Sequence, residues 1–165
     1  LLCVDSFDDD TQTLIFSTIV KGYFKRGYSG DVSQQAGNVV QATMRTYREA
    51  MKGLLPTPSK SHYTFNLRDF SRVVQGVLLQ EPSDQFQNKP SVMRLWTHEA
   101  LRVFGDRLTD DTDRQWMCDH CSAMCKEVFK CDFQSEFDHI RPADETETGY
   151  GTLRRLFWGL SLIHI

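Results

Sequence analysis

The chain has 165 residues and a formal net charge of −3 at pH 7, and a chain of this length suits one domain or one and a half. So small a charge gives no electrostatic basis for binding nucleic acid or an acidic membrane surface, and neither is expected as a partner. No apolar run approaches the roughly 20 residues that a membrane-spanning helix needs. The five cysteines are an odd count and no signal peptide is evident, so we expect free thiols in the reducing cytoplasm.

Hydrophobic periodicity predicts an all-α chain up to about residue 130. Apolar residues recur at helical spacing in five stretches, which proline, glycine or polar caps separate. The second apolar stripe is predicted to include Met51 and Leu55. We expect an antiparallel helical bundle, followed by an irregular linker over the polar stretch 132–148. The predicted helices cover residues 11–26, 31–55, 67–79, 90–108 and 110–129.

The most informative segment connects the second and third predicted helices. Pro56 and Pro58 end one helix, because proline lacks an N–H and disfavours helix in the residue before it. Asn66 is the predicted N-cap of the next helix, with Arg68 in its first turn and Arg72 one turn later. A cation in the first turn opposes the helix dipole, so Arg68 is not placed for helix stability.

Two interpretations of Arg68 stay open at this point. The simpler one is a solvated helix face. The other is a guanidinium that reaches a phosphate held by a neighbouring domain, where its bidentate fork suits the ligand and its charge suits phosphoryl transfer. Composition and spacing do not decide between them.

Several motifs of self-contained enzymes are absent from the sequence. It contains no Gly-x-x-x-x-Gly-Lys-Ser/Thr phosphate loop, no Gly-x-Ser-x-Gly and no His-Glu-x-x-His. We therefore predict no catalytic residue in this chain by itself.

Four of the five cysteines lie close together, which raises the question of a zinc site. Cys118, Cys121, Cys125 and Cys131 surround His120, and zinc favours these ligand types. Structural zinc sites usually take two ligand pairs from separate elements, however, whereas the first three cysteines share the apolar face of one predicted helix. We predict buried core thiols and no metal.

Other residues of chemical interest have simpler explanations. His62 has no catalytic partner and is predicted to hydrogen-bond locally in its loop. The acidic runs 8–10 and 110–113 lack the glycine and terminal glutamate of an EF-hand, and helix capping explains both. Trp96, Phe104 and Trp116 fall at helical spacing and are predicted to belong to the core.

Three blocks of sequence together resemble one family. Residues 55–69 are Leu-Pro-Thr-Pro-Ser-Lys-Ser-His-Tyr-Thr-Phe-Asn-Leu-Arg-Asp, and residues 95–108 are Leu-Trp-Thr-His-Glu-Ala-Leu-Arg-Val-Phe-Gly-Asp-Arg-Leu. Both blocks, and the segment that begins at Phe7, resemble the third AAA+ module of axonemal dynein heavy chains. The likeness covers roughly residues 5–159, and the tail 160–165 departs from the family pattern.

The resemblance implies a domain organisation. Residues 1–30 would be the end of an AAA+ large subdomain, 31–131 the helical lid subdomain, and 132–165 a linker and the start of the next module. Because the chain starts without Met and ends on an apolar tail, we expect a fragment whose last residues are non-native. Arg68 matches the sensor-2 position, which faces nucleotide, and Arg72 is the second choice for that role.

The resemblance also implies a function for the parent protein. Dynein heavy chains are ATP-driven, minus-end-directed microtubule motors of cilia and flagella, with ATP or ADP and Mg as cofactors. The implied partners are neighbouring AAA+ modules, dynein intermediate and light chains, and microtubules, and the implied location is the cytoplasm, cytoskeleton and ciliary axoneme. This piece alone is expected to bind no nucleotide. The alternative hypothesis is a non-enzymatic helical scaffold or adaptor domain, which would have no need of the capped Arg68 helix.

Overall fold

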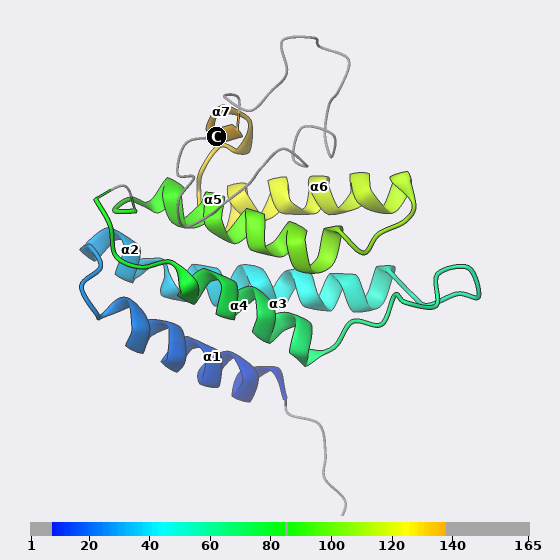
Figure 1. Cartoon of the computed structure of the whole chain (residues 1–165), viewed down its shortest axis with the longest axis horizontal. Coiled ribbons are helices and arrows are strands. Elements are labelled where there is room, and N and C mark those ends of the chain that lie inside the picture. The colour runs from blue at the N-terminus through cyan, green and yellow to red at the C-terminus, as the bar shows by residue number, and fades with distance from the viewer. Residues whose placement is uncertain (1–7, 85, 138–165) are drawn as a thin grey trace, which may run out of the picture.

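The computed structural model describes residues 8–84 and 86–137, and every regular element within them is a helix (Figure 1). The all-α prediction is confirmed for these residues. In Figure 1, α1 lies at the bottom of the view and α6 near the top, and α3 contacts α1, α4, α5 and α6. The elements are α1 (Asp9–Phe24), α2 (Gly30–Gln34), α3 (Ala36–Gly53), α4 (Leu67–Leu79), α5 (Lys89–Ala100), a π-helical segment η1 (Leu101–Gly105), α6 (Asp111–Glu127) and α7 (Phe133–Phe137).

Two predicted helices differ from the observed ones. The predicted helix 31–55 is two helices, α2 and α3, with Gln35 between them. The Ser33 hydroxyl donates to the Phe24 carbonyl at 2.8 Å, which ties the short α2 to the end of α1. The predicted helix 90–108 is α-helical only to Ala100, then continues as the π-helical segment.

The predicted positions of two apolar side chains and of the linker are wrong. Met51 and Leu55 are 40% and 60% exposed rather than inward, although Leu54 between them in the sequence is buried. Met51 is on the uncovered side of the last turn of α3, and Leu55 follows the helix end. A short helix, α7, interrupts the predicted linker: Phe133 and Phe137 are one turn apart with ring centroids 4.7 Å apart, and Phe137 is buried. The rest of the predicted linker, the next-module start and the tail lie outside the described residues.

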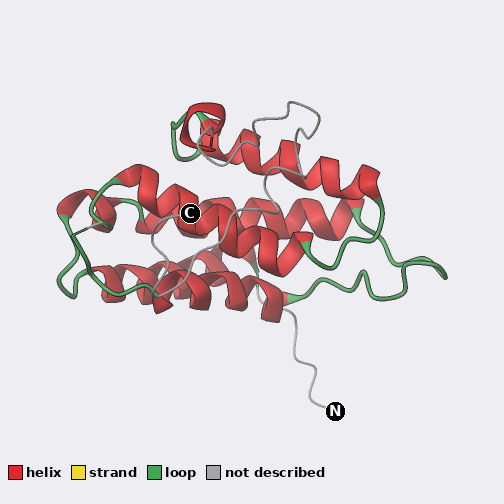
Figure 2. Cartoon of the chain, turned by 45° about the horizontal axis from the view of Figure 1, so that its top comes forward, coloured by secondary structure: helices red, strands yellow, loops and turns green. Residues whose placement is uncertain are grey.

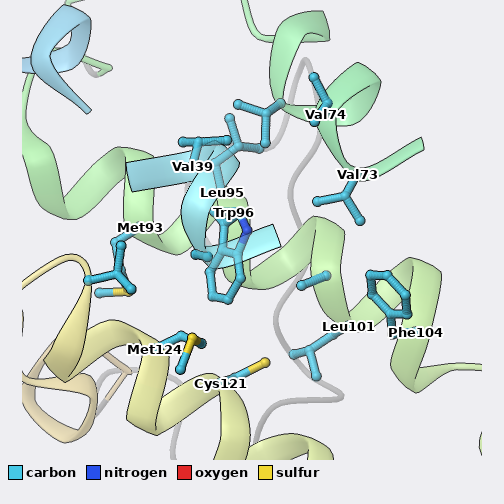
Figure 3. Close-up of a cluster of buried hydrophobic side chains, with 14 of the residues drawn as sticks. Val39, Val73, Val74, Met93, Leu95, Trp96, Leu101, Phe104, Cys121 and Met124 are labelled. Atoms are coloured by element: carbon cyan, nitrogen blue, oxygen red, sulfur yellow. The ribbon is translucent and has the colours of Figure 1, made fainter. Parts of the chain in front are cut away.

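The core is centred on Trp96 of α5. Figure 3 shows its indole pointing toward Met124 and Cys121 of α6, and all three side chains are buried. The indole N–H donates to the Thr43 hydroxyl at 3.0 Å, and that hydroxyl donates in turn to the Val39 carbonyl. The predicted core role of Trp96 and Phe104 is confirmed, whereas Trp116 is only partly buried.

The cysteines of α6 are core residues, as predicted. Cys118, Cys121 and Cys125 are buried, and Cys131, beyond the helix, is partly exposed. Burial raises the pKa of the Cys118 and Cys125 thiols to about 12 and raises that of Cys121 well above its usual value. Among the described residues, no group of three or more His, Cys, Asp or Glu side chains is arranged to hold a metal ion.

We expect a thiol-alkylating reagent at mildly alkaline pH to modify Cys131 of the folded chain well before the three α6 cysteines. The thiolate is the reactive form, and burial keeps the reagent from the α6 thiols and raises their pKa. Burial raises the pKa of Cys131 as well, but its thiol is partly exposed and therefore accessible. Peptide mapping by mass spectrometry would give the rate at each cysteine, with denatured chain as the control in which all react. Equal rates for Cys121 and Cys131 in the folded chain would contradict the assignment.

Helix α1 combines a packed face with an exposed apolar one. Val20 and Phe24 are fully buried, and the Phe16 ring lies 4.3 Å from the Phe70 ring of α4. Leu14 and Ile19 of the same helix are nevertheless 68% and 48% exposed. The helix therefore packs on α3 and α4 while part of its apolar surface remains uncovered. The described helices include none with the length and apolar character needed to cross a bilayer.

Because of this uncovered surface, we expect the amides of α1 to exchange hydrogen before those of α4 in the isolated chain. Local opening needs less free energy where fewer apolar contacts are lost. Hydrogen–deuterium exchange with peptide-level mass spectrometry would compare peptides covering residues 9–24 and 67–79. Equal protection of the two helices would contradict this expectation, and would mean that the exposed apolar side chains of α1 do not make the helix open more easily.

Candidate functional site

The start of α4 is defined by a capping box. The Asn66 side-chain oxygen accepts a hydrogen bond from the Arg68 N–H at 2.9 Å. The Asp69 carboxylate reaches back and accepts from the Asn66 N–H at 3.0 Å. One N–H group of the N-cap residue and one of the first turn are thereby satisfied, so the predicted N-cap is confirmed.

An ion pair between a buried carboxylate and a partly exposed arginine anchors this first turn to the chain that follows η1. Asp69 is only 3% exposed, and its Oδ1 accepts from the Arg107 Nη2 at 2.7 Å. The same guanidinium donates to the Thr64 carbonyl at 3.3 Å and lies 5.1 Å from the centre of the Phe65 ring. Arg107 therefore holds both the loop before α4 and the first turn of the helix.

A second set of contacts holds the loop to the start of α6. The Lys60 ammonium pairs with Asp110 at 2.9 Å and with Asp113 at 2.5 Å. The Tyr63 hydroxyl donates to Asp113 at 2.9 Å and accepts from the Thr109 N–H at 3.0 Å. Figure 2 shows this loop as the long connection that projects from one end of the helices.

The predicted side-chain caps of the two acidic runs are wrong. Asp110 and Asp8 are the N-cap residues of α6 and α1, but neither side chain makes a capping hydrogen bond. Asp110 pairs with Lys60 instead, and this ammonium holds the pKa of the Asp110 carboxyl below its usual range. In the same loop, His62 Nε2 lies 2.9 Å from the Arg107 carbonyl oxygen. The predicted local hydrogen bond of His62 is thus wrong, since its partner lies 45 residues away.

The two predicted nucleotide-sensing arginines lie on the exposed side of α4. Arg68 is exposed, and no ion pair or hydrogen bond to its guanidinium is recorded among the described residues. Arg72, also exposed, lies with Nη1 3.5 Å from the Asp69 carboxylate. Arg68 is therefore the cation that remains available to an external anion on this helix turn, while Arg72 is partly neutralised.

Sequence reasoning missed the residues that position Arg68. Asp69 could have been found from its place three residues after the N-cap, where a carboxylate completes a capping box. Arg107 and Asp113 carry no local signal, because they act across 38 and 53 residues of sequence. The site is thus an exposed arginine on a helix start that two long-range ion-pair clusters hold in place.

Comparison with known proteins agrees with this architecture. Residues 18–114, more than half of the chain, match the family described as dynein heavy chain, ATPase lid domain. The chain belongs to the dynein heavy chain family. The match includes the capped helix α4, the loop before it, and Arg107.

Relatives of this dynein segment include axonemal heavy chains. Human dynein axonemal heavy chain 12 is 45% identical over 157 residues, which are 94% of this chain and 5% of that protein. Human dynein axonemal heavy chain 3 is 42% identical over 159 residues, 96% of this chain and 4% of the relative. Mouse dynein axonemal heavy chain 1 is 49% identical over 89 residues, 54% of this chain and 2% of the relative. The chain thus spans a small part of the length of these relatives.

Proposed function

We propose that this dynein segment is the nucleotide-sensing lid of an AAA+ module, the third, in an axonemal motor driven by ATP. The lid carries no phosphate loop of its own, so ATP or ADP with Mg would be held by the large subdomain of the module. The role of the lid is to place a cation against the nucleotide phosphates when the module closes. The parent motor would act on microtubules in the ciliary axoneme.

The observation that carries this proposal is the unpaired Arg68 on a rigidly held helix start. An arginine in the first turn weakens the helix through the dipole, and Arg68 has no partner among the described residues to offset this cost. A guanidinium that is exposed, and positioned by neighbours it does not itself contact, suits a bidentate contact with a phosphate. In phosphoryl transfer such a cation stabilises charge on the transferred group.

The exposed apolar face of α1 supports a second part of the proposal, the neighbouring modules as partners. Leu14, Ile15 and Ile19 are each more than 40% exposed. Exposed apolar side chains, among which Ile15 and Ile19 are one helical turn apart, favour burial against another surface. Large subdomains of the same heavy chain are the proposed cover, while intermediate and light chains would bind elsewhere on the parent.

The test is to replace Arg68 with alanine in a heavy-chain motor that contains this segment. If Arg68 contacts the nucleotide phosphates, turnover at that module should fall on the order of 10²-fold. The fold should survive, because the side chain is exposed and its loss opens no cavity. The measurements are single-module nucleotide turnover and nucleotide-driven release from microtubules.

Two matched variants on the same helix serve as controls for Arg68→Ala. Arg72→Ala removes a cation one turn later that already faces Asp69, so its effect should be smaller. Ser71→Ala changes an exposed neutral side chain between them and should leave turnover unchanged. A normal Arg68→Ala motor with an impaired Arg72→Ala motor would move the sensing role to Arg72. If neither arginine matters, this helix face is only solvated surface.

A further inference from the structure

Thr57 lies in an exposed loop and is followed by proline. Of the five prolines in the sequence, only Pro58 follows a serine or threonine. The side chains of Pro56, Thr57, Pro58 and Ser59 are all exposed, and no helix includes them. Figure 1 shows the connection between α3 and α4 projecting away from the packed helices. The chain therefore offers one Thr-Pro step, and presents it at the surface.

Few contacts hold this step in its present turn. The Lys60 N–H donates to the Thr57 carbonyl at 2.9 Å, which closes the turn. The Thr57 and Ser59 hydroxyl oxygens lie 3.2 Å apart. Since the ion pairs of the loop begin at Lys60, opening the turn over 56–59 breaks, among contacts within residues 8–84 and 86–137, this backbone bond and the hydroxyl contact. An exposed segment with so few contacts can open at low free-energy cost.

We propose that Thr57 is a phosphorylation site for a proline-directed protein kinase. The Thr57 Oγ attacks the γ-phosphorus of the kinase-bound Mg–ATP, and an O–P bond forms. The bond between that phosphorus and the β–γ bridging oxygen breaks, ADP leaves, and the hydroxyl proton passes to the catalytic base of the kinase.

Two features of the sequence around Thr57 fit this class of kinase. Pro58 has no N–H and biases Thr57 toward the extended backbone that a kinase substrate adopts. Lys60 adds a cation at the third position after the acceptor, and kinases select substrates in part by such charge patterns. Because Asp110 and Asp113 hold this ammonium in the folded chain, a kinase that reads its charge must also release these two ion pairs. Proline next to the acceptor and a cation three residues on together indicate the cyclin-dependent class.

Phosphorylation would change the contacts of Lys60. The phosphate carries close to two negative charges and three acceptor oxygens, at the other end of the turn that Lys60 closes. It would compete with Asp110 and Asp113 for the Lys60 ammonium and weaken the attachment of the loop to α6. The Asp69–Arg107 pair does not involve Lys60, so the start of α4 should stay capped.

The experiment incubates the folded chain with Mg–ATP and a purified cyclin-dependent kinase. One phosphoryl group per chain is expected, mapped to Thr57 by tandem mass spectrometry. Thr57→Ala and Pro58→Ala should each lose most of the incorporation, whereas Ser59→Ala should retain it. A synthetic peptide covering residues 52–64 serves as the unfolded reference substrate.

Three results would overturn the proposal. Phosphorylation of the peptide with none on the folded chain would show that the turn does not open for a kinase. Incorporation at Ser59 or Ser61 in place of Thr57 would show that the phosphorylation site is a different residue. Absence of incorporation in both substrates would show that this sequence is not a substrate of the kinase. None of these outcomes bears on Arg68, because the proposal does not depend on nucleotide sensing.

Discussion

Replacing Arg107 with alanine is expected to lower the free energy of unfolding by about 2 kcal/mol, because a buried carboxylate loses its main ion-pair partner and keeps only Arg72, 3.5 Å away, as a nearby cation. Asp69 is 3% exposed and takes its shortest ion-pair contact, 2.7 Å, from Arg107. The same substitution removes the contact with the Thr64 carbonyl and the packing on the Phe65 ring. Urea denaturation followed by far-ultraviolet circular dichroism would measure the change.

Arg102 provides a matched control for Arg107. It lies five residues earlier and pairs with Asp106 at 3.0 Å, but the side chains of Arg102 and Asp106 are 34% and 40% exposed. Exposed pairs of this kind contribute at most about 1 kcal/mol, so Arg102→Ala should have a much smaller effect. Equal losses for the two variants would contradict the anchoring role of Arg107.

A second variant separates the buried charge from the rest of the Arg107 contacts. Adding Asp69→Asn to Arg107→Ala replaces the buried carboxylate, which has then lost its main partner, with a neutral amide, and part of the lost stability should return. In the whole motor, Arg107→Ala should also weaken the response attributed to Arg68, because the start of α4 would no longer be held in place.

Replacing Trp96 with alanine is the second change with a large expected effect, a loss of about 4 kcal/mol in the free energy of unfolding. The indole is fully buried, packs 5.4 Å from the Phe129 ring, and donates to Thr43. It joins α5 to α3 and to the end of α6, so its removal opens a cavity where three helices meet. Thermal and urea unfolding of the isolated chain would measure the loss.

Trp96→Phe and Trp116→Ala test the physical reasons for this loss. Phenylalanine keeps most of the buried ring and forfeits the hydrogen bond, which is worth about 1 kcal/mol, so Trp96→Phe should be far milder. Trp116 is only partly buried and stacks on His120 with ring centroids 5.3 Å apart. If Trp116→Ala lost as much stability as Trp96→Ala, the degree of burial would not explain how much each tryptophan contributes to stability.

The sequence by itself determined the helical class, the bounds of α4 and the burial of the α6 cysteines. These features depend on interactions between residues close in sequence. Asn66 caps a turn two residues away, and Cys118, Cys121 and Cys125 share one face through the helical repeat. The same local logic places Arg68 in the first turn of its helix.

Only the tertiary structure decided what holds that helix start and its loop in place. Asp69 meets Arg107 across 38 residues, and Lys60 meets Asp113 across 53. Such pairs leave no periodic pattern, because they depend on how whole helices pack. The same reason explains why the exposure of Met51 was not predicted, because it depends on which side of α3 the other helices cover. The formation of α7, whose Phe137 is buried, likewise depends on packing against α6. Local sequence therefore specified Arg68 and the start of α4, and long-range packing specified the ion pairs that hold this helix start in place.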